Sequence, residues 1–198
     1  MLNIADNKGK AMTESAYLTG RLLLAMPGMA DPRFHRAVIF ICAHDANGAM
    51  GLVLNQPAAG VTLGKVLDQM NITANPGQAG LPVLTGGPVD NNRGFVLHTP
   101  DFRQPDTVRV NDDFCVTSTI DALKAVAVGK GPSNLLFMLG YSGWGAGQLE
   151  KELQENAWLV ADPRPSLVFT TTASEKWSAA IKSLGFDLAM LSEEAGRA

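Results

Sequence analysis

The sequence predicts an α+β fold, a single domain in which a mainly antiparallel sheet is flanked by helices. Two observations lead to this class. Strand-sized apolar runs occur in clusters instead of alternating strictly with helical segments, and a turn-forming Asn47-Gly48 pair separates two of these runs. Strands that follow one another closely pair antiparallel, whereas a parallel pair needs a crossover of a dozen or more residues. We therefore expect antiparallel pairs and not a doubly wound parallel sheet.

The clearest expected strands form a hairpin. Residues 38–43 and 51–54 are β-branched or aliphatic, and Asn47-Gly48 between them favours the positive φ angles of a tight reversal. A further strand is expected at residues 134–141, where the apolar run 135–139 is typical of a strand buried on both faces. The other strand candidates are residues 81–84, 94–98, 107–110, 114–117 and 167–170.

Four helices are expected from helical spacing and from residues that favour helix starts. Thr62, Thr119 and Thr172 precede three of them, because a threonine hydroxyl can accept a hydrogen bond from the first turn. Thr172 with Glu175 fits a capping box. The fourth helix covers residues 148–156. It follows a glycine-rich turn at residues 143–147, where we expect the glycines to reverse the chain and Trp144 to pack as an anchor.

Composition excludes several classes of protein. Hydrophobic residues are 46% of the 198 and charged residues 18%, which suits a folded core. The net charge is −3 and the basic residues are scattered, so direct DNA binding is disfavoured. No apolar run reaches the roughly 20 residues of a membrane-spanning helix, and the N-terminus lacks the order of a secretory signal. We predict a cytoplasmic protein with no membrane partner.

The domain organisation follows from the distribution of apolar residues. Residues 1–16 are polar and lack apolar periodicity, so we expect a disordered N-terminal tail followed by one domain at residues 17–198. The two cysteines, Cys42 and Cys115, lie in apolar stretches. We expect both to be buried and reduced, as small hydrophobic side chains.

Several separated motifs, taken in order, resemble those of the YqgE/AlgH family of bacterial proteins. They are Leu22 to Pro27 with Asp31 and Phe34, Gly48 to Pro57, Gly86-Gly87-Pro88-Val89, Leu97-His98, Gly140 to Glu150, Trp158 and Trp177. The resemblance extends from about Leu18 to Phe186. It implies a single domain of coiled, forked sheets. Members of the family are described as uncharacterised or as candidate transcriptional regulators, so the resemblance implies a regulatory role but no catalytic residue.

The glycine-rich turns could bind a small ligand. In residues 85–88, backbone N–H groups could form an anion nest with Arg93 nearby, although a sharp turn between strands explains the same residues. Residues 143–147 lead into a helix N-terminus, which attracts anions. The carboxylates that follow, Glu150, Glu152 and Glu155, are expected to balance the helix dipole themselves. The candidate ligand-binding residues are Asn55, Gly86, Gly87, Arg93, His98, Gly143, Trp144, Gly147 and Gln148.

No catalytic or metal-binding residue is predicted. Ser142 lies at an expected strand-to-helix turn, but Trp144 stands where a nucleophile elbow needs its second glycine. His35, His44 and His98 are far apart in sequence, with no cysteine at ligand spacing. We interpret His98 as a satisfied core residue or a lone polar handle, and Asn55 as a residue that hydrogen-bonds turn backbone.

The function that we predict is binding and not catalysis. The protein would act through an unknown protein or small-molecule partner, without a cofactor, and its regulatory role is implied by the family resemblance alone. The alternative is a hydrolase-like enzyme that uses the glycine-rich turns as a site for a small anion or ligand. A pocket in which these turns meet Asn55, Arg93 and His98 would favour the alternative.

Overall fold

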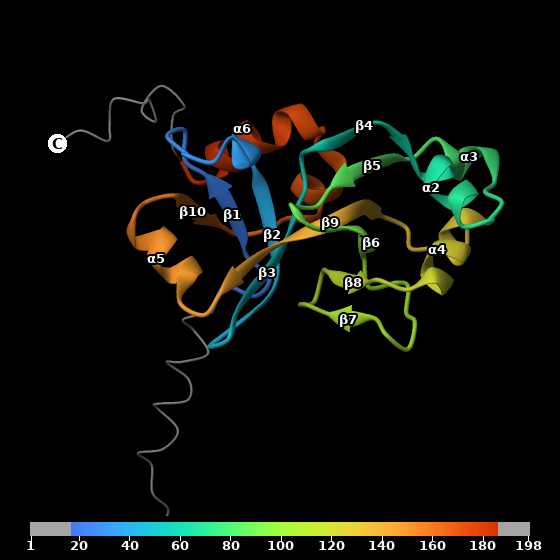
Figure 1. Cartoon of the computed structure of the whole chain (residues 1–198), viewed down its shortest axis with the longest axis horizontal. Coiled ribbons are helices and arrows are strands. Elements are labelled where there is room, and N and C mark those ends of the chain that lie inside the picture. Colours follow the sequence, from blue (N-terminus) through green and yellow to red (C-terminus); the bar gives the residue numbers. More distant parts are fainter. Residues whose placement is uncertain (1–16, 186–198) are drawn as a thin grey trace, which may run out of the picture.

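A sheet of ten strands runs through residues 17–185, the part of the chain that this computed structural model describes (Figure 1). The strands are β1 (Leu22–Ala25), β2 (Val38–Asp45), β3 (Gly48–Val53), β4 (Pro57–Thr62), β5 (Pro82–Thr85), β6 (Val89–His98), β7 (Val108–Arg109), β8 (Cys115–Thr117), β9 (Leu135–Gly145) and β10 (Trp158–Ala161). The helical segments are η1 (Pro32–Phe34), α2 (Leu63–Gln69), α3 (Pro76–Ala79), α4 (Ile120–Ala127), α5 (Gln148–Gln154), η2 (Ser166–Thr170) and α6 (Ala173–Ser183). Among these strands every pair is antiparallel except β5 with β9, so the predicted α+β class is confirmed.

The long strand β9 belongs to both parts of this sheet. Its residues 137–139 lie between β5 and β6, whereas residues 142–145 pair with β3. The strand order from β9 is β3, β2, β1 and β10 on one side, and β6, β8 and β7 on the other. Figure 1 shows α5 and α6 beside the first group of strands, and α2, α3 and α4 at the opposite end of the molecule. The C-terminal end of β9 is thereby held where α5 begins.

Alternating side chains of β1 and β2 fill two clusters on opposite faces of the sheet. Leu22 and Leu24 belong to the cluster that contains Trp177 of α6. Leu23 and Ala25 belong to the cluster that contains Trp144, Leu149 and Trp158, on the side of α5. A third cluster lies at the α2 and α4 end and includes Leu63, Leu67, Leu123 and Phe137. The strands β1 and β2 are therefore covered on both faces.

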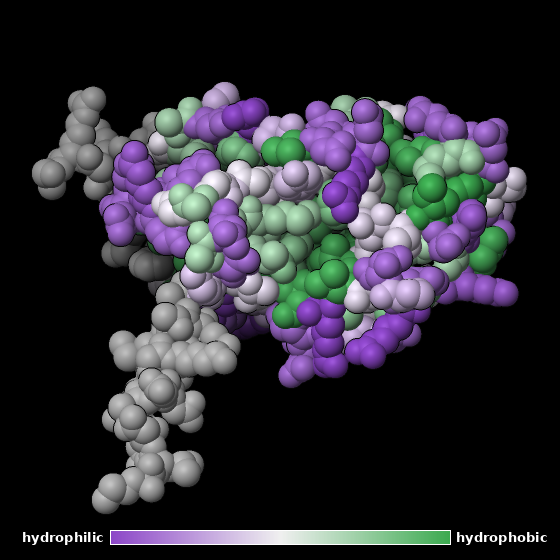
Figure 2. Space-filling view, turned by 60° about the horizontal axis from the view of Figure 1, so that its bottom comes forward, coloured by the Kyte–Doolittle hydropathy of each residue, from purple (hydrophilic) through white to green (hydrophobic). Residues whose placement is uncertain are grey.

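Some apolar surface remains outside these clusters. Figure 2 shows hydrophilic residues around much of the rim of one face and hydrophobic residues nearer its centre. Val108 and Ile120 are 59% and 54% exposed, and isolated apolar residues of this kind are normal on a protein surface. In the described part of the chain, no helix combines the length and the apolar character needed to cross a bilayer.

The predicted hairpin is confirmed, because β2 and β3 pair antiparallel with Asp45 opposite Gly48. The helix starts are confirmed within a residue or two, but their caps differ. Thr119 accepts a hydrogen bond from the Ala122 N–H, whereas the predicted capping box at Thr172 does not form. Instead the Thr172 hydroxyl donates to the Glu175 carboxylate at 2.7 Å. The predicted N-terminal tail, residues 1–16, lies outside the described residues.

Two predictions about secondary structure are wrong. Residues 167–170 are expected as a strand but belong to the π-helix η2, and the last sheet strand is instead β10. A short apolar run cannot be assigned to strand or helix by periodicity alone, and here Leu167 and Val168 are both buried although they are adjacent. The expected reversal at residues 143–147 is also shorter, because β9 continues to Gly145.

Candidate functional site

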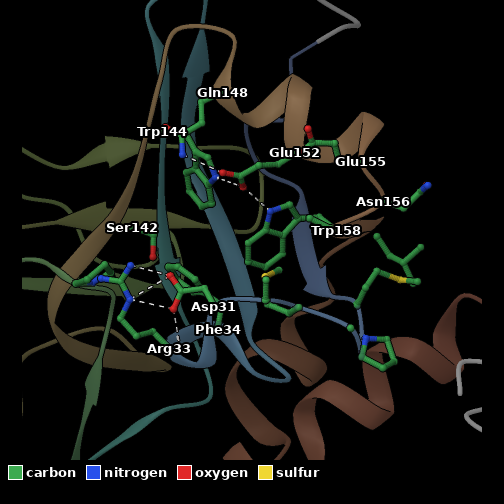
Figure 3. Close-up of a pocket in the computed structure, with 18 of the residues that line it drawn as sticks. Asp31, Arg33, Phe34, Ser142, Trp144, Gln148, Glu152, Glu155, Asn156 and Trp158 are labelled. Atoms are coloured by element: carbon green, nitrogen blue, oxygen red, sulfur yellow. Dashed lines mark hydrogen bonds and ion pairs between the residues drawn. The ribbon is translucent and has the colours of Figure 1, made fainter. Parts of the chain in front are cut away.

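A pocket of about 790 Å³ opens beside α5, between the end of β9, the start of β10 and the loop that leads into η1 (Figure 3). Residues from four separate parts of the chain line it. They are Met26 to Asp31, Arg33, Phe34, Pro88, Ser142 to Trp144, Gln148, Glu152 and Glu155 to Leu159. The pocket therefore forms only when β9, α5 and β10 are packed against the loop of residues 26–34.

Glu152 of α5 is hydrogen-bonded to both tryptophans of the pocket. Its Oε2 accepts from the indole Nε1 of Trp144 at 2.9 Å and from that of Trp158 at 2.8 Å. Its Oε1 accepts from the Gln148 amide at 2.9 Å, since residues four apart share one face of a helix. Gln148 in turn accepts from the Gly145 N–H at 3.0 Å. This chain of hydrogen bonds fixes the carboxylate at the wall of the pocket.

The two indole rings are packed as part of the core. Trp144 is 7% exposed and Trp158 is 4% exposed. Their rings meet edge to face with centroids 6.1 Å apart, and Phe34 meets Trp158 in the same manner at 5.7 Å. The anchor role predicted for Trp144 is therefore confirmed. Three aromatic rings in such contacts add stability beyond their buried area and hold the shape of the wall.

Asp31 and Arg33 form an ion pair at another side of the pocket, as Figure 3 shows. The Arg33 Nε lies 3.0 Å and 3.1 Å from the two carboxylate oxygens, and its Nη2 lies 2.7 Å from Oδ2. The hydrogen bonds from Arg33 lower the pKa of the Asp31 carboxyl from its usual value. The cation of Arg33 is thus already matched by a carboxylate of the same wall.

The structure brings only some of the predicted site residues together. Gly143, Trp144 and Gln148 line the pocket, with Pro88 beside them. Gly147 does not line it, but has a φ of +73° and is the N-cap residue that precedes α5. The remaining candidates, Asn55, Gly86, Gly87, Arg93 and His98, lie outside the lining.

Gly86 and Gly87 allow a close approach of backbone to β9. A Cβ on Gly86 would lie 2.3 Å from the Gly140 carbonyl oxygen, and one on Gly87 would lie 2.2 Å from the Tyr141 carbonyl carbon. The Gly86 N–H donates to the Leu139 carbonyl at 2.8 Å, so this donor of the expected anion nest is occupied. These residues position β9, and Arg93 lies over the Phe95 ring at 5.2 Å.

Asn55 and His98 both have fixed structural partners. The Asn55 Oδ1 accepts from the Val38 N–H and its Nδ2 donates to the Arg36 carbonyl, both at 2.8 Å, as expected for an asparagine that bonds turn backbone. His98 is fully buried, with its Nδ1 2.8 Å from the Thr99 carbonyl and its Nε2 2.9 Å from the Thr117 hydroxyl. Burial lowers the pKa of His98, which favours a neutral ring. Among residues 17–185 no three His, Cys, Asp or Glu gather as a metal site.

Ser142 is not placed as a nucleophile elbow requires. The residue lies inside β9 and not at a strand-to-helix turn, so that prediction is wrong. The residue is 1% exposed, and its hydroxyl oxygen lies 3.5 Å from the Gly86 carbonyl oxygen. No base among the described residues is hydrogen-bonded to it, and a serine nucleophile needs such a partner.

Contrary to the prediction, the carboxylates of Glu150 and Glu152 in α5 and of Glu155 just after it do not jointly balance the helix dipole. Glu150 accepts from the His44 ring at 3.0 Å, Glu152 holds the two indoles, and Glu155 lies 3.8 Å from Lys151. The sequence analysis did not predict that Glu152 would bind two indole groups. The pattern that could have indicated it is a two-turn helix with one tryptophan before it, Trp144, and another after it, Trp158. Residues 26–34 carried no local signal of a site, because their contact with α5 depends on tertiary packing.

The fold and the pocket define a class of protein: a single α+β domain with a forked, mainly antiparallel sheet and a ligand-sized cavity at one end. Residues 22–189 match the bacterial family described as AlgH-like (DUF179), and the chain belongs to that family. A UPF0301 protein of Jannaschia sp. (strain CCS1) is 50% identical over 183 residues, which are 91% of this chain and 95% of the relative.

Two solved structures share the fold. The solution structure of the AlgH protein from Pseudomonas aeruginosa aligns with a TM-score of 0.77 and 40% identity, over 92% of this chain and 96% of that one. The crystal structure of protein DIP2367 from Corynebacterium diphtheriae aligns with a TM-score of 0.71 and 22% identity, over 88% and 91%. The family resemblance drawn from the sequence motifs is thus confirmed.

Proposed function

We propose that this protein is a binding protein and not an enzyme, and that the pocket beside α5 receives its ligand. The observation that carries the proposal is the pocket itself, whose volume of about 790 Å³ lies within the range typical of ligand sites. The ligand is either a small molecule or a side chain of a partner protein.

The lining has the two properties that a ligand site needs. Met26, Met29 and Phe34 offer partly exposed apolar surface, and methionine side chains adapt to the shape of a ligand. Glu152 and Gln148 supply polar groups whose orientation is set by hydrogen bonds before any ligand arrives. Preorganised groups of this kind reduce the entropy lost on binding.

The hydrolase alternative lacks a comparable observation. It depends on Ser142 or on the glycine-rich turns, but the Ser142 hydroxyl faces a carbonyl oxygen and the Gly86 N–H is bonded within the sheet. An acyl-transfer site needs a nucleophile beside a base and free donors for the oxyanion. The contacts of these residues support a structural role.

We place this binding step in the cytoplasm, and any effect on transcription would be indirect. The net charge of −3 and the scattered basic residues disfavour phosphate contacts, so regulation would pass through the bound ligand or partner and not through DNA. This reading keeps the regulatory role that the family resemblance implies.

The three tryptophans of the chain provide the test. Trp144 and Trp158 have their indole N–H groups at the pocket wall, whereas Trp177 donates to the Ala25 carbonyl at 2.9 Å in a different cluster. We would record the three indole ¹H–¹⁵N signals during titration with a library of fragment-sized aromatic amines, alcohols and acids. Binding in the pocket shifts the signals of Trp144 and Trp158 and leaves Trp177 nearly unchanged. A library in which no compound does so would contradict the proposal.

A further inference from the structure

We infer that the ligand of this pocket is a small organic cation with an apolar body, an ammonium or guanidinium group on a hydrocarbon or aromatic frame. The inference rests on the proposed binding function and adds the chemical class of the ligand. Among residues 17–185, three acidic residues line the pocket, Asp31, Glu152 and Glu155, together with one cationic residue, Arg33. The lining is therefore acidic by two formal charges.

Arg33 does not reduce the charge of the rest of the pocket. Its guanidinium is held by both oxygens of Asp31, in the bidentate arrangement that is the strongest form of this pair. An anionic ligand would have to compete with Asp31 for this cation. The two partners cancel each other, and the net charge that remains belongs to Glu152 and Glu155.

Glu152 has only neutral donors around it. Two indole N–H groups and one amide donate to its oxygens, and within residues 17–185 no lysine, arginine or histidine forms an ion pair with it. A carboxylate has about four acceptor positions, so three such bonds leave room for one more donor. The side chain is half-buried, which makes a charged partner more valuable than it would be in water.

Glu155 adds to the same field. Its cationic neighbour Lys151 lies at 3.8 Å with a side chain that is 75% exposed, and a pair of this kind is weak. Lys151 is not part of the lining. Glu155 also follows the last turn of α5, where the free carbonyl groups carry partial negative charge. Both features favour a cation at this side of the pocket.

The apolar part of the ligand follows from the apolar residues of the lining. Met26, Met29 and Phe34 are partly exposed and bring no charge. An inorganic cation would leave this surface in water, whereas an amine with an aromatic or aliphatic body would cover it. Removing such surface from water favours binding. The pocket thus selects on both charge and apolar area.

The experiment compares three probes that share one frame: 2-phenylethylamine, 2-phenylethanol and 3-phenylpropionate. Each is titrated into the full chain while the indole signals of Trp144 and Trp158 are followed. We expect the amine to bind about tenfold more tightly than the alcohol, as one charge-assisted contact in a partly exposed site provides, and the propionate to bind most weakly. The advantage of the amine should fall as salt is raised.

Variants identify the carboxylate that is responsible. Glu152→Gln keeps the size and one acceptor oxygen, and should reduce the preference for the amine by several-fold. Glu150→Gln removes the same charge from the same helix, at a residue that contacts His44 and does not line the pocket, and should leave the preference unchanged. An unshifted Trp177 signal reports that each variant is folded.

The outcomes separate this inference from the proposed function. If the alcohol or the propionate shifts the pocket signals as strongly as the amine, the pocket binds ligands but the cationic class is wrong. If none of the three shifts them, the cationic class fails, and the fragment library decides whether the pocket binds any ligand. A further titration uses an acetylated, amidated Leu-Arg-Leu peptide, and tighter binding of this peptide than of the amine would overturn the free small cation in favour of a side chain of a partner protein.

Discussion

Gly87 offers the sharpest test of how this fold holds the pocket. A Cβ at this position would lie 2.2 Å from the Tyr141 carbonyl carbon and 2.4 Å from the Ser142 nitrogen. Ordinary carbon contacts need about 3.5–4.0 Å, so the backbone of β9 would have to move by more than about 1 Å. The φ of +153° at Gly87 adds strain for any residue with a side chain.

The loss of stability expected for Gly87→Ala is the sum of these two costs. Overpacking costs about 1–3 kcal/mol, and a sparsely populated backbone conformation costs about 1–3 kcal/mol more. We therefore expect Gly87→Ala to lower the free energy of unfolding by about 2–6 kcal/mol. For a domain of this size that is a fall in Tm on the order of 10 °C.

Gly143→Ala is the matched control, because it adds the same methyl group to the facing strand. Its Cβ would meet the Tyr141 ring at 3.5 Å, an ordinary contact, and Gly143 has no positive φ. We expect its free energy of unfolding to stay within about 1 kcal/mol of the parent. Thermal and urea unfolding of the two variants, side by side, is the assay. Equal stability of Gly87→Ala and Gly143→Ala would refute the close-approach account of Gly87.

Three other substitutions test separate parts of the account. Trp144→Ala should cost about 3–5 kcal/mol in urea unfolding, since it removes a buried ring, and an unchanged midpoint would contradict its anchor role. Ser142→Ala should change the free energy of unfolding by less than about 1 kcal/mol, because its 3.5 Å contact is weak. Burial lowers the pKa of Lys176 from 10.5 to about 8, so between these values the unfolded chain binds a proton that the folded chain has released, and stability rises with pH. Between pH 7 and pH 10 the free energy of unfolding of the parent should therefore rise by about 2–3 kcal/mol relative to that of Lys176→Met. A difference in free energy of unfolding that does not change with pH would show that Lys176 is not desolvated.

Much of the sheet could be predicted from local patterns. The Asn47-Gly48 pair fixed the hairpin because a tight reversal depends on a few adjacent residues. The end of β9 could not be predicted in the same way. Gly143 and Gly145 read as turn residues, yet they lie opposite Met50 and Gly48 in a regular ladder. Pairing with a distant strand overrode the local preference of glycine.

The site was only partly predictable for the same reason. Trp144 and Gln148 stand next to a glycine-rich segment that the sequence marks, and both line the pocket. Glu152 acquires its role from two indoles that converge on it from different strands. Arg93 and His98 were expected to join the site because they are close to the turns in sequence. Instead the Arg93 guanidinium lies over the Phe95 ring, and the His98 ring is hydrogen-bonded to the Thr117 hydroxyl. Convergence of this kind depends on the tertiary fold.

The most direct test of the central claim is a crystal structure of the protein soaked with 2-phenylethylamine. The account predicts density for the amine in the pocket beside α5, with its nitrogen about 2.7–3.0 Å from a Glu152 oxygen and its ring against Met26, Met29 or Phe34. Density at another surface only, or a pocket that stays without the amine at a concentration that shifts the indole signals, would contradict it.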